Sequence, residues 1–94
     1  MRDVIGETNK VVIDFFSKRC LACKNVNMII EKLEKEYDDI TFLKVDVHEK
    51  RDLAKRFGVI ALPVLVFLKD GREVERLKGA RSEKEIREFI ERNR

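Results

Sequence analysis

Hydrophobic positions along the first part of the chain change from the period of a strand to that of a helix. A run of β-branched and aromatic residues over 11–16, interrupted by Asp14, predicts a strand buried on both faces. From Cys20 to Tyr37 the apolar residues recur at helical spacing and form one continuous stripe. Two aspartates, 38–39, then end the pattern. We therefore expect a buried strand followed by a long amphipathic helix.

The rest of the chain predicts two strands around a short helix, and then a hairpin. Alternation over 40–47 indicates a strand, and an apolar face over 48–57 that stops at Gly58 indicates a short helix. The apolar run 64–68 predicts another buried strand. An Asp-Gly turn follows it and predicts an antiparallel partner strand over 73–77.

The last helix begins at a capping box. Ser82 is followed three residues later by Glu85, ahead of the apolar positions Ile86, Phe89 and Ile90. The predicted order is strand, helix, strand, helix, strand, strand, helix. This order indicates an α/β fold with two parallel crossovers and a closing hairpin.

Composition narrows the class of protein. Ninety-four residues, 44% hydrophobic and 41% charged, indicate one folded domain over 1–94. The net charge is only +3 and both signs are interleaved, which argues against nucleic-acid binding. The polar first ten residues and the absence of a long apolar segment predict a cytoplasmic protein without a membrane span. Abundant Lys, Arg and Glu with no Gln is a composition associated with hot environments.

The candidate chemistry lies in the only two cysteines, Cys20 and Cys23, which follow the first strand at the start of the long helix. Residues three apart there share a face and can form a disulfide, while the helix N-terminus stabilises negative charge on the first sulfur. Lys18, Arg19 and Lys24 add positive charge nearby. We therefore expect Cys20 to have a lowered pKa and to be the nucleophile.

Other roles for the cysteine pair remain open from the residues alone. A zinc site would need two more ligands, and the chain has one histidine, His48, so a metal or iron-sulfur cluster would have to be shared between chains. The thiols could also be inert and buried, or form a static disulfide that stabilises little because its loop is so short. No cofactor is expected.

Five segments, taken in order, resemble the thioredoxin family. They are residues 12–16, 20–24, 43–47 and 57–63, and 69–71 with Gly79. The resemblance implies the thioredoxin fold, with a four-stranded mixed sheet flanked by helices. Thioredoxins usually begin with an additional helix and strand, so the N-terminus here is shortened; Val4 and Ile5 are expected to pack as a short helical turn or an edge.

The resemblance also implies a thiol-disulfide oxidoreductase that reduces protein disulfides. Cys20 would attack the client disulfide and Cys23 would resolve the mixed disulfide. Asp14 matches the buried acid that accepts the proton from Cys23, with Lys44 as its counter-charge. The residues alone also single out Asp14: a carboxylate buried in an apolar strand is costly, so it must either have a polar partner or have a raised pKa. Expected partners are client proteins and a thioredoxin-reductase-like electron donor, and the chain is expected to be a monomer.

By the same resemblance, Pro63 is a cis proline facing the cysteines, and Leu62 and Pro63 form the client platform, with Ala61 and Arg19 beside it. By base rate alone an X-Pro bond is cis only about one time in twenty. Ala61 replaces a glycine of the client groove, and we expect the groove to be narrower.

The cysteine motif departs from the family pattern. Arg19 stands where a tryptophan is usual, Leu21 and Ala22 replace Gly-Pro, and Met28 replaces a helix-kinking proline. Positive charge beside the thiolate stabilises the reduced form and makes a disulfide more oxidising. The direction of electron flow is therefore open between a reductase and an oxidase or isomerase. A binding module that uses the Pro63 groove without turnover is a further alternative.

Overall fold

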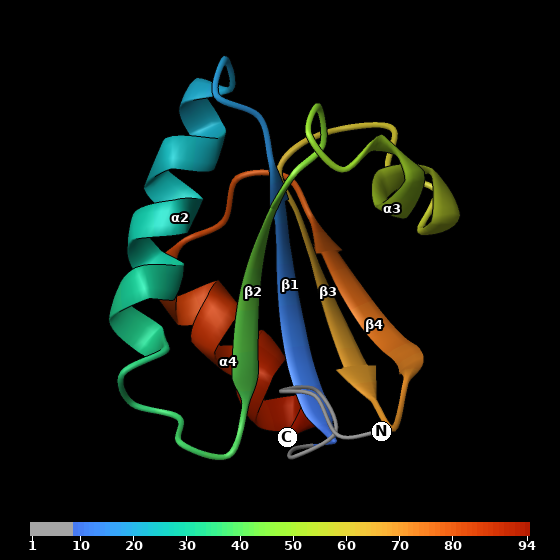
Figure 1. Ribbon diagram of the computed structural model, residues 1–94. Coiled ribbons are helices and arrows are strands. Elements are labelled where there is room, and N and C mark those ends of the chain that lie inside the picture. The colour runs from blue at the N-terminus through green and yellow to red at the C-terminus, as the bar shows by residue number, and fades with distance from the viewer. Residues whose placement is uncertain (1–8) are drawn as a thin grey trace.

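The structure, a computed structural model, describes residues 9–94 of the chain. Within them a four-stranded mixed sheet carries helices on both faces (Figure 1). The strands are β1 (Lys10–Phe16), β2 (Thr41–Asp46), β3 (Val64–Lys69) and β4 (Arg72–Lys78). The helices are α2 (Leu21–Leu33), α3 (Arg51–Arg56) and α4 (Glu83–Asn93). The predicted order of elements is confirmed, while the expectation for Val4 and Ile5 falls outside the described residues.

The strands lie in the order β2-β1-β3-β4, and only one of the two predicted parallel crossovers is present. β1 pairs with β2 in parallel, but β3 runs antiparallel to β1. The connection from β2 to β3, residues 47–63, therefore leaves and re-enters the sheet at the same end. The prediction of a second parallel crossover was therefore wrong.

Residues of β1 alternate between two hydrophobic cores. Val12 faces α2 and α4, where it packs in a cluster with Ile30 and Phe89. Val11, Ile13 and Phe15 face the side of α3 and pack with Val45, Val64 and Val66. Because side chains alternate along a strand, Asp14 lies on the same face as Val12, beneath α2. Both faces of β1 are thus buried, as the apolar run predicts.

The chain leaves α2 earlier than the apolar stripe predicts. The helix ends at Leu33 rather than at Tyr37. Glu36 N–H donates to the carbonyl of Leu33 (2.9 Å), three residues back, so the last turn is tightened into a 3₁₀-type turn. Tyr37 is still buried, and its hydroxyl donates to Glu91 (2.7 Å). The pattern therefore predicted the burial of Tyr37 correctly and the helix end incorrectly.

The short helix α3 is also shorter than the predicted span of 48–57. A turn closes first around Asp46, whose carboxylate accepts from the N–H of His48 and whose carbonyl accepts from the N–H of Lys50, both at 2.9 Å. The helix begins only after that turn, at Arg51.

Both predicted turn and cap signals are confirmed. Asp70 and Gly71 have φ of 53° and 82°, the positive values that a tight two-residue hairpin turn requires. Ser82 and Glu85 form a reciprocal capping box at the start of α4.

Because the inner face of α2 packs against the sheet, shortening a side chain on that face is expected to lower the stability of the protein. Ile30 is 1% exposed, so Ile30→Ala removes core packing and is expected to lower the free energy of unfolding by roughly 2–5 kcal/mol. Met28 on the same helix is 66% exposed, and Met28→Ala should change it by less than about 0.5 kcal/mol. Urea unfolding of both variants measures the contrast, and equal losses would contradict this packing.

Candidate functional site

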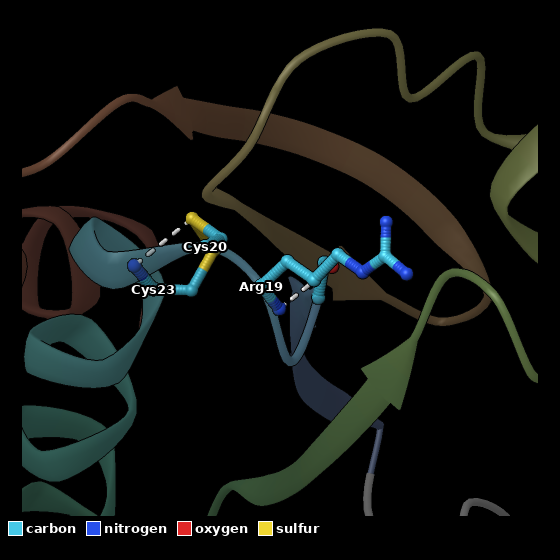
Figure 2. The surroundings of a disulfide bond; sticks show 4 residues. Arg19, Cys20 and Cys23 are labelled. Atoms are coloured by element: carbon cyan, nitrogen blue, oxygen red, sulfur yellow. Dashed lines mark hydrogen bonds between the residues drawn. A yellow bond between two sulfur atoms is a disulfide. The ribbon is translucent and has the colours of Figure 1, made fainter.

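The loop between β1 and α2 places Cys20 at the helix start. Its backbone is extended (φ −93°, ψ 107°), and it is the N-cap of α2. Ser17 holds the loop: its carbonyl accepts from Cys20 N–H (3.1 Å) and its hydroxyl from Arg19 N–H (3.2 Å). The Cys20 sulfur in turn accepts from the N–H of Cys23 (3.1 Å), as Figure 2 shows. A sulfur at this position receives the electrostatic benefit of the helix N-terminus.

Cys20 and Cys23 are joined as a disulfide, with their Cα atoms 5.2 Å apart. The predicted proximity of the pair is confirmed. Their exposures differ: Cys20 is partly exposed, whereas Cys23 is completely buried. An incoming sulfur can therefore reach Cys20, and Cys23 lies behind it.

The positive side chains near the pair are spread over the surface. Figure 2 shows the Arg19 side chain directed away from the two sulfur atoms. Lys18 forms an ion pair with Glu49 (3.4 Å), and Lys24 is exposed. The described contact that could stabilise charge on the Cys20 sulfur is therefore the N–H of Cys23 at the helix N-terminus.

Asp14 is completely buried on the α2 side of β1. Burial raises its pKa from 3.8 to about 7; Lys44 opposes this shift and Glu31 adds to it. A carboxyl group with this pKa can both accept and release a proton near neutrality, which is what a general base requires.

Lys44 lies opposite Asp14 in the register of β1 and β2, as a counter-charge would. Its ammonium group forms an ion pair with Glu31 of α2. The charge of Lys44 is thus shared between Glu31 and the buried acid.

Two polar side chains at this site were missed from the sequence. In its hydrogen-bonding orientation, the Asn27 amide donates to both carboxylate oxygens of Asp14 (2.5 and 3.2 Å) and to the carbonyl of Cys23 (3.1 Å). Glu31 is the second. Helical spacing could have found them, because Cys23, Asn27 and Glu31 follow one another at intervals of four residues and share a face of α2.

The loop before β3 lies at the same end of the sheet as the start of α2 (Figure 1). The Leu62-Pro63 bond is cis, as the resemblance implied. Pro63 is buried, Leu62 partly exposed and Ala61 exposed. The carbonyl of Pro63 accepts from Gly79 N–H (2.8 Å), which ties this loop to the end of β4.

Residues 9–94 contain no group of three or more His, Cys, Asp or Glu side chains placed to hold a metal ion. The single histidine, His48, is exposed.

In the same part of the chain, no helix is both long enough and apolar enough to cross a membrane.

Comparison with known proteins gives one consistent result. A family model described as Thioredoxin matches residues 1–92. Thioredoxin-2 of Saccharomyces cerevisiae is 44% identical over 70 residues, which cover 74% of this chain and 67% of the relative. Thioredoxin H2 of Arabidopsis thaliana is 39% identical over 80 residues, covering 84% of this chain and 60% of the relative. The matches to the first four curated relatives span 60% to 67% of their length.

A solved structure resembles this one closely. The X-ray structure of Fasciola hepatica thioredoxin superposes with a TM-score of 0.89 at 40% identity and covers 97% of this chain and 88% of that one. The predicted four-stranded mixed sheet flanked by helices is confirmed.

The buried carboxyl group makes stability depend on pH. The folded-state pKa of Asp14, about 7, lies above the unfolded value of 3.8, so its favourable contribution is complete below pH 3.8 and is lost as the pH rises through about 7. At pH 8, Asp14→Asn is therefore expected to raise the free energy of unfolding by on the order of 2–4 kcal/mol, with the gain shrinking towards pH 4.

Denaturant unfolding at several pH values measures this gain. The matched control is Asp38→Asn, which neutralises an exposed carboxylate and should change stability little at any pH. A gain at Asp14 that does not vary with pH would contradict the titration.

Proposed function

The chain belongs to the thioredoxin family, a family of thiol-disulfide oxidoreductases, and on that premise we propose that it reduces protein disulfides through Cys20 and Cys23. The observation that carries the proposal is the unequal exposure of the two sulfurs. Cys20 is partly exposed at the N-cap of α2, and Cys23 is buried one turn further in, beside the Asn27–Asp14 contact.

The cycle begins with both cysteines reduced. The Cys20 thiolate attacks one sulfur of the client disulfide, forming a mixed disulfide and releasing the other client sulfur as a thiolate. Asp14, directly or through water, takes the proton of the Cys23 thiol. The Cys23 thiolate then attacks the Cys20 sulfur and releases the second client thiolate. Two electrons pass to the client, and the pair ends as the Cys20–Cys23 disulfide.

Regeneration requires two electrons from outside the chain. A thioredoxin-reductase-like donor would reduce the Cys20–Cys23 disulfide, and the Asp14 proton would return to Cys23 in the reverse of the resolving step. Lys44, opposite Asp14 and paired with Glu31, limits the rise of the Asp14 pKa so that the carboxylate form remains accessible near neutrality.

The client would bind around the cysteines and the loop before β3. Leu62 and Pro63 would offer backbone to an extended client chain, and Ala61 and Arg19 would border it. Two large apolar side chains support this surface: Leu21 is 78% exposed and Ile60 is 98% exposed. Exposed apolar groups in a polar surround are characteristic of protein-binding surfaces.

We also propose that the chain acts as a monomer in the cytoplasm of an organism from a hot environment. An ion-pair network on the surface supports the last point: Arg87 pairs with Glu36 and Glu83, and Glu83 pairs with Lys32. Such networks contribute more at high temperature. One similar protein is named as a mitochondrial thioredoxin of Saccharomyces cerevisiae; fluorescence localisation of the native protein tests the cytoplasmic assignment, and a signal confined to an organelle would overturn it.

Insulin reduction with dithiothreitol as the electron source tests the enzyme assignment. The parent chain is expected to turn over, Cys20→Ser to lose all turnover, and Cys23→Ser to stall as a covalent mixed disulfide visible by mass spectrometry. A folded parent chain that binds client but shows no turnover would instead support a thioredoxin-fold binding module.

The direction of electron flow is tested separately by equilibrating the Cys20–Cys23 pair with glutathione buffers. For a reductant we expect a potential near that of thioredoxin, about −270 mV. A value at or above about −180 mV, where protein disulfide isomerase lies, would overturn the reductase assignment in favour of an oxidase or isomerase.

A further inference from the structure

The side chain of Asn27 joins two parts of the site that the sequence does not connect. It lies on α2 one turn after Cys23, and in the amide orientation that satisfies its neighbours its nitrogen donates to the carbonyl of Cys23 (3.1 Å) and to the carboxylate of Asp14 (2.5 and 3.2 Å). One neutral donor therefore bridges the backbone of the buried cysteine and the buried acid. Neither partner is free to move without breaking a hydrogen bond.

The location of Asn27 argues for a role beyond forming the helix. Asparagine is a weaker helix former than Ala or Leu in a helix interior. Its side chain is half-buried against β1, whereas Asn25 on the same helix is exposed. A residue with poor helical propensity in this inner position is best explained by the hydrogen bonds that it makes.

These hydrogen bonds act on the charge of Asp14. Donors to a carboxylate favour its ionised form, whereas burial favours the neutral form. The other charged groups that act on Asp14 are Lys44 from β2 and Glu31 from α2, and these two pair with each other. Among the described residues, Asn27 is thus the one whose side chain donates a hydrogen bond directly to the Asp14 carboxylate.

We propose that Asn27 is a positioning residue for the resolving step: its amide fixes the Asp14 carboxylate beside Cys23 and keeps it ionised at lower pH than burial alone would allow. The inference deepens the proposed function, because it assigns Asn27 to the proton transfer from Cys23 to Asp14. It acts through Asp14 and takes no part in bond making or breaking.

Two measurements test the proposal with Asn27→Leu, which keeps the branched side-chain shape and favours the helix, but is larger and lacks the donor. The first is the titration of the Asp14 carboxyl carbon by NMR in the oxidised protein. Loss of the hydrogen bonds is expected to raise its midpoint by about one pH unit. The matched control, Asn25→Leu on the exposed side of α2, should leave the midpoint unchanged.

The second measurement is a stopped-flow reaction of the reduced protein with a chromogenic aromatic disulfide. The concentration-independent second release of aromatic thiol reports the attack of Cys23 on the mixed disulfide. Below the parent's midpoint, Asn27→Leu should slow this phase about tenfold while leaving the first release and the high-pH rate unchanged, since a shift of one pH unit changes the ionised fraction tenfold. Asn27→Ala serves as a second variant if the leucine does not fit.

Coincident titration midpoints and pH profiles in the parent, Asn27→Leu and Asn25→Leu would overturn the role of Asn27. The NMR titration does not depend on turnover. A parent chain that fails to reduce insulin but shows the shifted Asp14 midpoint in Asn27→Leu would therefore reject the proposed function and retain the hydrogen-bonding role.

Discussion

The carboxyl group of Asp14 is buried at the centre of the sheet, and its polar contacts constrain both α2 and β2. β1 pairs on both edges, with β2 and β3, and both of its faces are covered. A carboxylate there has lost its water, and the cost is reduced only where polar groups reach it. Those groups come from α2 and β2, in the form of Asn27 and the Lys44–Glu31 pair. The position of α2 over β1 is therefore fixed by polar contacts as well as by its apolar stripe.

The pairing register of β1 and β2 decides which residue of β2 lies beside Asp14. The parallel pairing of β1 and β2 sets Asp14 opposite Lys44. A slip of one residue would exchange the two faces of β1 and move the carboxyl group into the apolar cluster beneath α3, away from Asn27 and Lys44. The alternation of Val11, Val12 and Ile13 between two cores opposes that slip. Core packing and the acid's environment thus specify the same register.

The features that the sequence predicted correctly are those encoded locally. The Asp-Gly turn, the Ser82 capping box and the apolar runs of β1 and β3 each depend on residues close together in the chain. Cys20 and Cys23 were also found locally, because three residues at a helix start share a face. The direction of β3 was missed because the sequence pattern gives the order of the strands, but not the end of the sheet at which the connection of residues 47–63 re-enters it. The end of α2 was missed because Tyr37 packs into the core from a turn as well as it would from a helix.

The polar side chains around Asp14 were harder to predict, because their role appears only when α2 is laid on the sheet. Asn27 is unremarkable in the sequence, and Lys44 was assigned from the family resemblance. In the folded protein, the two cysteines at the start of α2 lie in different electrostatic environments. Cys20 lies at the helix N-cap, where a backbone N–H and the helix dipole stabilise a charged sulfur. Cys23 is completely buried, and burial disfavours its charged form. A base is therefore needed at the inner cysteine only, and that is the side of α2 on which Asp14 lies.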